Sequence, residues 1–490
     1  MASAPTQDEK AVVDGAPHQL YIAGEWRDAT GGETLDVEDP STGEVIAQVA
    51  DATPDDAAAA LDACVAVQEE WKHHPPRERG EILRRAWELI AQRTDELAVL
   101  MTLEMGKPIA ESKAEIAYAG EFFRWFAEEA VRIEGRFASA PNGVGRLITM
   151  KQPVGPCYAI TPWNFPMAMG TRKIGPAVAA GCTMVIKPAQ QTPLSMLALG
   201  RILEEAGLPA GVLNIVTSAS SSDVSKPIIG DPRLRKLTFT GSTEVGKMLV
   251  EQSAQQLLRT SMELGGNAPF LVFADADVDA AVEGALIAKM RNIGEACTAA
   301  NRFHVADRIR DEFTEKLAQR MGEMPVGRGT EEGVKVGPLI DDNQRTIVAD
   351  LVEDAVSKGA QAVVGGQRRD GAGYFYEPTV LAGVSEDANL LRDEIFGPVA
   401  PVVGFDDEEA AIAAANNTEY GLVAYVYTND VKRAFRVCEG LEVGMVGLNQ
   451  GLVSNPAAPF GGIKASGFGR EGGREGIAEY LETKYVAMAM

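Results

Sequence analysis

Three polar side chains occupy positions where they can act on a carbonyl group. Cys297 follows an amphipathic segment that runs out at Gly294, and a thiol at a loop or helix start can be exposed and reactive. Glu263 ends a strand-like run beside two glycines, where a carboxylate can serve as a base. Asn164 lies between a strand and a helix in residues 161–166 (TPWNFP), where its amide can donate to an oxyanion.

Each of these residues also has an ordinary structural explanation. Most cysteines are small buried apolar residues, so Cys297 can belong to a core. Glu263 can be a solvated charge at a strand end, and Asn164 can be a cap or turn residue. Taken singly, none of the three establishes an active site.

A second set of residues is suited to an anionic ligand. Residues 241–247 (GSTEVGK) follow a strand and open a helix, whose N-terminus can bind phosphate. The segment does not match the P-loop pattern, because Met248 replaces the Ser or Thr that binds Mg²⁺. This difference disfavours a nucleotide hydrolase. It also lacks the G-x-G-x-x-G pattern, so a plain glycine turn stays possible. Lys187 ends another strand and is either a ligand-edge cation or a surface lysine.

The remaining cysteines and the histidines do not suggest a metal or disulfide framework. The five cysteines are scattered with no C-x-x-C spacing, which favours a reducing compartment and argues against structural zinc. Cys64, Cys157, Cys182 and Cys438 lie in apolar periodic segments and are predicted to be core residues. The four histidines show no metal-ligand spacing, so we expect no metal, and a Cys–His hydrolase finds little support.

Composition sets the broad class of the protein. The chain has 490 residues, 46% of them apolar, and a formal net charge of −24. This charge makes a nucleic acid an unfavourable partner, although a local basic pocket remains compatible with it. The start of the chain lacks the apolar core of a signal peptide, and no apolar run is long enough to span a membrane. We therefore expect a cytoplasmic protein.

Alternating strands and helices must position these residues. Between residues 157 and 264, short apolar runs alternate with helical segments, which predicts a parallel sheet with helices on both faces. Such sheets bind ligands beyond the carboxyl ends of their strands. The expected strands are Cys157–Thr161, Thr183–Ile186, Val212–Val216, Lys236–Thr240 and Arg259–Leu264.

A second α/β region follows. Strands are predicted at Phe270–Phe273, Val399–Val403, Val423–Tyr427 and Met445–Leu448, with a helix from Val278 to Met290. Further helices are expected over Thr53–Met105, Glu121–Glu134 and Glu475–Leu481. The apolar tail, Lys484–Met490, can pair with another subunit or with an edge of its own chain.

Taken together and in this order, the motifs resemble the aldehyde dehydrogenase superfamily. TPWNFP, VIKPA, FTGSTEVG, MELGG, GEAC, EIFGP and PFGG run through nearly the whole chain. The resemblance implies an aldehyde dehydrogenase-like α/β fold, with a Rossmann-type cofactor domain, an α/β catalytic domain and a small β oligomerisation arm. We expect the cofactor domain at residues 1–125 and 148–258, the catalytic domain at 259–470, and the arm at 126–147 and 471–490. Members are dimers or tetramers, so we expect a homo-oligomer.

The resemblance also assigns roles to individual residues. Cys297 would attack an aldehyde, and the Asn164 side chain with the Cys297 backbone N–H would stabilise the oxyanion. Glu263 would activate water to hydrolyse the thioester, and Lys173 would assist proton transfer. The expected cofactor-binding residues are Thr161, Pro162, Trp163, Lys187, Gln190, Gly241, Ser242, Leu264, Glu394 and Phe396.

Two departures from the family pattern bear on chemistry. Many NAD-preferring members carry a Glu where this chain has Gln190. Without that carboxylate a 2′-phosphate meets no like charge, so we expect NADP or NAD, with NADP accepted. Ala299 replaces a second cysteine common in related enzymes, so no disulfide is expected with Cys297, which stays open to overoxidation.

Three further segments look like the succinate-semialdehyde dehydrogenases: residues 169–173 (MGTRK), 289–294 (KMRNIG), and 452–455 (LVSN) before PFGG. In that group two arginines and a serine hold the far carboxylate of the substrate, which implies Arg172, Arg291 and Ser454, with Phe460 beside them. The arginines can instead pair with acidic neighbours. Oxidation of glutarate or 2-oxoglutarate semialdehyde, a broad aldehyde range, and a non-catalytic scaffold are the alternatives.

Overall fold

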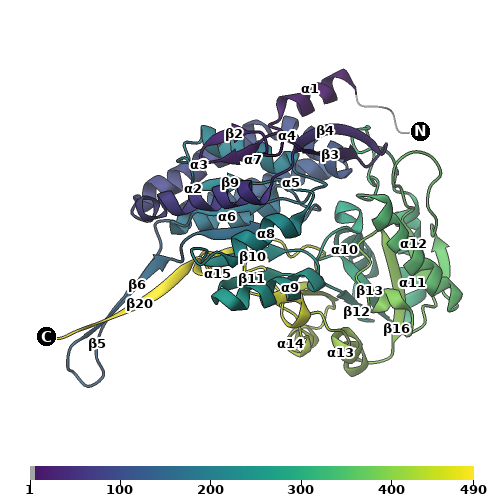
Figure 1. Ribbon diagram of the computed structural model, residues 1–490. Helices are drawn as coiled ribbons and strands as arrows, with labels where there is room; N and C mark the ends of the chain where they lie inside the picture. Colours follow the sequence, from purple (N-terminus) through teal and green to yellow (C-terminus); the bar gives the residue numbers. More distant parts are fainter. Residues whose placement is uncertain (1–5) are drawn as a thin grey trace.

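Two sheets built largely from parallel strands organise the chain, in a computed structural model that describes residues 6–490 (Figure 1). Residues 1–5, where the predicted cofactor domain begins, lie outside the described residues. We call the part around the first sheet lobe 1 and the part around the second sheet lobe 2. The first sheet has the strand order β19-β11-β10-β7-β8-β9-β1-β2.

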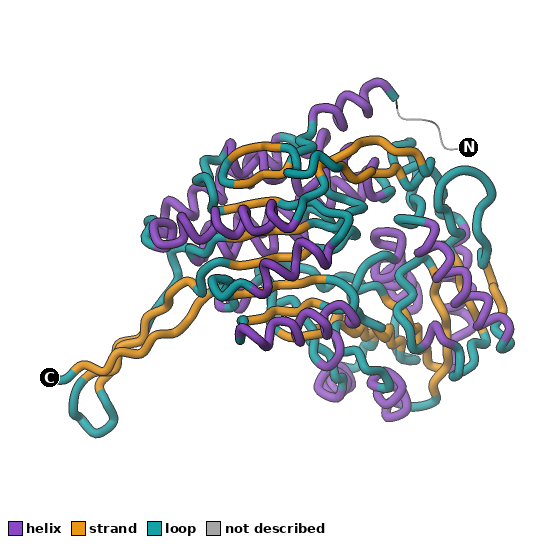
Figure 2. Tube along the Cα trace, viewed as in Figure 1, coloured by secondary structure: helices purple, strands orange, loops and turns teal. Residues whose placement is uncertain are grey.

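The first sheet is parallel in its centre and antiparallel at its ends. Its central strands are apolar because helices cover both faces (Figure 2). The strands are β1 (Leu20–Ile22), β2 (Glu25–Arg27), β7 (Cys157–Ile160), β8 (Met184–Lys187), β9 (Leu213–Ile215), β10 (Lys236–Thr240), β11 (Arg259–Glu263) and β19 (Gly467–Phe468). The helices are α2 (Pro54–Lys72), α3 (Pro76–Gln92), α4 (Thr94–Met105), α5 (Ile109–Glu129), α6 (Ala168–Ala180), α7 (Leu194–Glu205), α8 (Ser221–Gly230) and α9 (Thr243–Ser253).

Four strands of this sheet end at the same edge, because they run parallel. β7 leads into the TPWNFP segment, β8 ends on Lys187, β10 leads into Gly241, and β11 ends on Glu263. The expected strand bounds agree with these to within one or two residues. The edge therefore gathers the polar residues that lie far apart in the sequence.

The second sheet has the order β14-β15-β16-β13-β12-β17-β18 and is parallel except for the β14–β15 pair. Its strands are β12 (Ala268–Val272), β13 (Ala300–Ala306), β14 (Gln361–Val364), β15 (Thr379–Ala382), β16 (Val399–Phe405), β17 (Val423–Tyr427) and β18 (Met445–Leu448). Its helices are α10 (Val278–Met290), α11 (Asp307–Gly322), α12 (Asp342–Ser357), α13 (Glu408–Asn416) and α14 (Val431–Gly440).

A three-stranded antiparallel arm projects from the body of the protein (Figure 1). It consists of β5 (Arg136–Ser139), β6 (Arg146–Pro153) and β20 (Leu481–Met488). β20 pairs with β6 of the same chain from Leu481 opposite Pro153 to Met488 opposite Arg146. Of the two interpretations of the tail, pairing within its own chain is the one observed in the described residues.

Smaller elements complete the chain: α1 (Gln7–Gly15), the hairpin of β3 (Thr34–Asp39) and β4 (Glu44–Ala50), and α15 (Gly473–Ala478). None of the helices among residues 6–490 is both long and apolar enough to cross a membrane. The division into three domains stays a prediction.

For two predicted helices, the predicted end residues were wrong. The helix expected at Glu121–Glu134 is α5, which starts at Ile109 directly after Pro108 and ends at Glu129. The helix expected at Glu475–Leu481 is α15, which ends at Ala478 because the chain turns to enter β20. Cys438, predicted to be a core residue, is only half-buried on α14, whereas Cys64, Cys157 and Cys182 are fully buried.

Candidate active site

A cavity of about 280 Å³ collects residues from both lobes. Lobe 1 lines it from the carboxyl ends of β7, β10 and β11, and lobe 2 from the segment before β13 and the segment before β16. Ten of the predicted site residues line this cavity: Pro162, Trp163, Asn164, Gly241, Ser242, Glu263, Leu264, Cys297, Glu394 and Phe396. Met169, Thr240, Gly265, Gln344 and Ile347 complete the lining and were not predicted.

Cys297 is presented by the short segment between α10 and β13. Its side chain is half-buried, and burial raises the pKa of its thiol to about 12. Arg172 and Arg291 oppose that shift, whereas Glu394 and Glu263 reinforce it. The protein on its own therefore keeps the thiol neutral, in contrast to the lowered pKa that a loop position can give.

Asn164 is held rigidly beside this segment. Its Nδ2 donates to the Glu295 carbonyl at 3.0 Å, and its Oδ1 accepts from the Phe165 backbone N–H at 3.1 Å. A primary amide has two N–H groups, so one remains for an oxyanion. The backbone N–H of Cys297 donates to no other described residue, which leaves a second donor at the cavity.

Glu263 is buried at the end of β11, and neither of its carboxylate oxygens has a hydrogen-bond partner among the described residues. Burial raises the pKa of this carboxyl well above its usual range, and the nearby negative charge of Glu471 adds to the effect. Arg172 and Lys173 act in the opposite direction. A carboxylate with a raised pKa and no fixed partner is suited to accept a proton from water.

Lys173 does not line the cavity but lies behind Glu263. Its Nζ donates to Glu471 and, at 3.1 Å, to Thr238 Oγ1. Glu471 also accepts from Arg172 Nε at 2.7 Å. Although burial raises the pKa of Glu471, the two cations lower it to about 2. Glu471 was missed by the sequence analysis because its two partners are almost 300 residues away.

The predicted cofactor residues in the cavity include an acidic and an aromatic group. Glu394 Oε1 accepts from the Gly266 backbone N–H at 3.3 Å, and burial raises the pKa of Glu394 to about 8. Phe396 has a positive φ of 51° and meets Trp163 edge to face, with ring centroids 5.3 Å apart. Ser242 caps α9 by accepting from the Val245 backbone N–H. The unpaired N–H groups at this helix start can bind a phosphate.

Three predicted cofactor residues do not line this cavity. Thr161 is buried, and its hydroxyl has no partner within the described residues. Lys187 Nζ donates to the Pro188 carbonyl at 3.0 Å, and burial lowers its pKa to about 8. Gln190 is exposed and lines a separate cavity of about 420 Å³.

The predicted substrate residues gather around a tyrosine that was not predicted. Arg172 is buried against the Phe460 ring, 4.0 Å from its centroid, and its Nη2 has no partner in residues 6–490. Both Arg172 and Arg291 act electrostatically on the buried Tyr118. The Ser454 hydroxyl lies near the Tyr118 hydroxyl. The Tyr118 hydroxyl has no hydrogen bond of regular geometry with a described residue.

Arg291 differs from Arg172 in its contacts. Its guanidinium lies 4.9 Å from the centroid of the Phe165 ring, and it forms no ion pair within the described part of the chain. It also lines a neighbouring cavity of about 670 Å³. The interpretation that both arginines pair with acidic neighbours is therefore met by Arg172, through Glu471, and not by Arg291.

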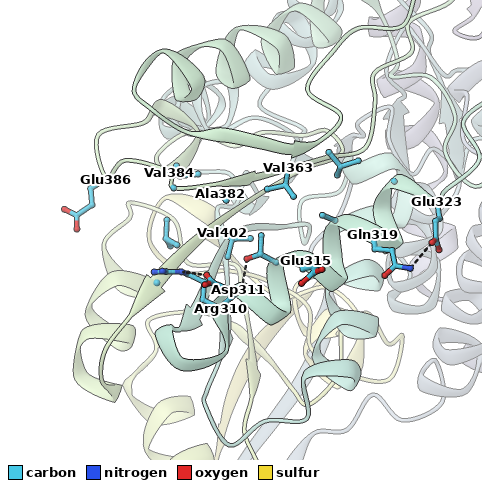
Figure 3. A pocket seen from close by; sticks show the side chains of 17 residues that line it. Arg310, Asp311, Glu315, Gln319, Glu323, Val363, Ala382, Val384, Glu386 and Val402 are labelled. Atoms are coloured by element: carbon cyan, nitrogen blue, oxygen red, sulfur yellow. Dashed lines mark hydrogen bonds and ion pairs between the residues drawn. The ribbon is translucent and has the colours of Figure 1, made fainter.

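A larger cavity of about 850 Å³ lies elsewhere in lobe 2, between α11 and strands β14 to β16 (Figure 3). Its floor is apolar, with Val363, Ala382 and Val402 facing the charged side chains of α11. It contains no thiol and none of the predicted site residues. No cluster of three or more potential metal ligands occurs in the 6–490 range.

Comparison with known proteins identifies the family. The profile of the aldehyde dehydrogenase family matches residues 26–486, and the chain belongs to this family. A relative from Paenarthrobacter nicotinovorans, named succinate-semialdehyde dehydrogenase, is 57% identical over 91% of this chain and 99% of its own length. A relative from Pseudomonas putida, named glutarate-semialdehyde dehydrogenase, is 52% identical over 96% of this chain and 98% of its own.

A solved structure agrees with the fold. The crystal structure of an E. coli NADP-dependent enzyme superposes with a TM-score of 0.96 and 50% identity, over 97% of this chain and 98% of that one. The expected aldehyde dehydrogenase-like α/β fold is therefore confirmed.

A first prediction follows from the raised pKa of Cys297. Because burial raises this pKa to about 12, the rate of Cys297 alkylation by iodoacetamide should rise about tenfold per pH unit, without a plateau, from pH 7 to 10. Peptide mass spectrometry would follow Cys297 separately from the half-buried Cys438. A plateau near neutral pH would show instead that the thiolate is already formed in the free protein.

Proposed function

We propose that the protein oxidises succinate semialdehyde to succinate with NADP or NAD, through a covalent intermediate on Cys297. The observation that carries the proposal is a set of unsatisfied positive donors close to the nucleophile. Arg172 Nη2 is buried without a partner, Arg291 has no ion pair with a described residue, and both act electrostatically on Cys297. A buried donor without a partner, such as Arg172 Nη2, is unfavourable until an acceptor binds it.

The residues of the cavity support the following steps. The Cys297 thiol loses its proton to water, the resulting thiolate attacks the aldehyde carbon, a C–S bond forms, and the carbonyl π electrons move to the oxygen. The remaining N–H of Asn164 and the backbone N–H of Cys297 stabilise this oxyanion. With a bound nicotinamide dinucleotide as the two-electron acceptor, the thiohemiacetal would give up its hydride and become a thioester on Cys297. Glu263 takes a proton from water, the water oxygen attacks the thioester carbon, and the C–S bond breaks to release succinate.

The cavity also fits a nicotinamide dinucleotide, which when bound supplies the two-electron acceptor for this oxidation. The fit rests on the open start of α9 at Ser242 and on the hydroxyls of Thr161 and Thr240, which have no hydrogen-bond partner among residues 6–490. Gly241 leaves room beside the Phe239 ring, because a Cβ there would approach it to 2.4 Å. Glu394 and Phe396 would hold the nicotinamide half, and Trp163 with Lys187 the adenosine half.

We further propose that Lys173 acts through Glu471 rather than on the substrate. Lys173 and Arg172 keep Glu471 ionised, and this fixed negative charge raises the pKa of Glu263. The arrangement makes Glu263 a stronger base once it has lost its proton.

A carboxylate at the far end of the substrate explains why two arginines stand near an aldehyde site. Charge-assisted hydrogen bonds from Arg172 Nη2, Arg291 and Ser454 would fix that carboxylate and place the aldehyde carbon at Cys297. Tyr118 lies among these groups and can donate its free hydroxyl to the same anion. The nearest competing substrate is glutarate semialdehyde, which the Pseudomonas putida relative is named for.

The proposal includes a homo-oligomer in a reducing compartment such as the cytoplasm. Exposed apolar side chains on the projecting arm, among them Phe137 and Tyr485, support self-association as a dimer or tetramer. All five cysteines are free thiols, which supports a reducing environment.

Substrate choice tests the function directly. Succinate semialdehyde should exceed butanal, which has the same carbon count and no carboxylate, by about 100-fold in kcat/KM, or roughly 3 kcal/mol. Arg291→Ala should remove most of that preference, and glutarate semialdehyde should be intermediate. Initial rates of reduced-cofactor formation would measure all three substrates.

Arg320→Ala is the matched control for that experiment. Arg320 lines the same neighbouring cavity as Arg291 but is exposed and paired with Glu283. Its loss should leave the substrate preference unchanged. Equal rates for succinate semialdehyde and butanal in the unaltered protein would contradict the assignment and leave a broad-range aldehyde dehydrogenase.

Cofactor choice is tested at Gln190. Placing a carboxylate there in Gln190→Glu should lower kcat/KM for NADP by about tenfold or more relative to NAD, because the carboxylate repels a 2′-phosphate. Gln191→Glu introduces the same charge one residue away in the same cavity and should have a smaller effect. An unchanged ratio in both variants would show that the 2′-phosphate does not bind near Gln190.

A further inference from the structure

The two oxyanion donors come from different lobes, so something must hold them together. Asn164 follows β7 in lobe 1, and Cys297 precedes β13 in lobe 2. Helix α10, whose end leads to Cys297, lies where the lobes meet (Figure 1). Oxyanion stabilisation requires donors within hydrogen-bonding distance of one developing charge. A small displacement between the lobes would therefore weaken it.

A second buried amide, besides that of Asn164, spans this boundary. Asn292 Nδ2 donates to the Asn164 carbonyl at 3.1 Å and to the Glu295 carbonyl at 2.8 Å. The Glu295 carbonyl also accepts from Asn164 Nδ2. Asn292 therefore contacts the backbone of the oxyanion donor and the backbone two residues before the nucleophile, and both N–H groups of its amide are used.

The backbone at this point restricts which residues can do this. Asn292, Ile293 and Gly294 all have positive φ values, of 55°, 63° and 81°. Asparagine is among the few non-glycine residues that adopt this left-handed conformation readily. Aspartate would share that tolerance but would present acceptors to two carbonyl oxygens. Asparagine alone among the short side chains combines the backbone conformation with two donors.

The lobe 1 side of this contact is fixed independently. Lys107 Nζ donates to the same Asn164 carbonyl at 2.7 Å and pairs with Glu115. Glu115 in turn accepts from the backbone N–H groups of Met167 and Ala168 at the start of α6. Lys107 and Glu115 thus anchor Asn164 within lobe 1, and Asn292 reinforces the bond by which the Asn164 side chain reaches the Glu295 carbonyl of lobe 2.

We infer that Asn292 is a positioning residue of the oxyanion site: its amide couples the Cys297 segment to Asn164 so that both donors converge on one oxygen. The inference rests on the oxyanion role proposed for Asn164. It assigns Asn292 no contact with substrate or cofactor.

A double-mutant cycle tests this coupling. Asn292→Gly keeps the positive φ without strain and removes the amide, and Asn164→Ala removes the oxyanion donor. Asn164→Ala should lower the first-turnover rate of aldehyde oxidation about 100-fold, and Asn292→Gly about 10-fold or more with KM little changed. The double variant should be at most about threefold slower than Asn164→Ala alone, because Asn292 acts through Asn164.

Alkylation of Cys297 by iodoacetamide separates positioning from unfolding, because that reaction forms no oxyanion. Its rate should stay within about threefold of the unaltered protein in all variants. If Asn164→Ala is impaired but Asn292→Gly is not, or if the two effects multiply, the inference on Asn292 is wrong and the proposed function stands. If Asn164→Ala retains full activity, the oxyanion assignment itself fails.

Discussion

The hydrogen bond from Asn164 to the Glu295 carbonyl, across the boundary between the lobes, is the contact on which the site depends. Lobe 1 supplies the proposed oxyanion donor, Asn164, and the proposed base, Glu263, at the carboxyl ends of its strands, and lobe 2 supplies the proposed nucleophile, Cys297. Neither lobe has the complete set. Because effective catalysis needs reacting groups placed to within a fraction of an ångström, the rigidity of this boundary is part of the chemistry.

The positively charged residues near the cavity contrast with the negative net charge of the whole chain. The protein has a net charge of −24, yet two arginines and a lysine surround the site, and one buried acid, Glu471, partners both Arg172 and Lys173. A single carboxylate cannot satisfy two cations fully, so Arg172 Nη2 is left without a partner among the described residues. Glu263 has no hydrogen-bond partner among the described residues, and burial raises its pKa, with a further contribution from the charge of Glu471.

Much of the fold and of the reacting groups could be predicted from the sequence. β10, β17 and β18 occupy the expected residues because each is a short apolar run bounded by turn residues. Cys297, Glu263 and Asn164 stand at segment ends, where motif and position coincide, and the structure brings them to one cavity. The start of α5 was missed because no cap residue marks the helix after Pro108.

The residues that hold the site together could not be predicted in the same way. Lys107, Asn292 and Glu471 act on partners 57, 128 and 299 residues away, and no local period or motif records such a contact. Tyr118 looks like one more apolar position of a helix until the fold places it beside Arg172 and Arg291. Contacts between residues far apart in the sequence depend on the fold, and no local pattern in a single sequence specifies them.

The most direct test of the account is to trap the covalent intermediate. Glu263→Gln, mixed with succinate semialdehyde and NADP and quenched in acid within one turnover, should yield a Cys297 peptide heavier by one succinyl group, because acylation proceeds while hydrolysis lacks its base. One equivalent of reduced cofactor per chain should accompany it. An unmodified Cys297 peptide together with continued full-rate turnover would contradict both the nucleophile and the base assigned here.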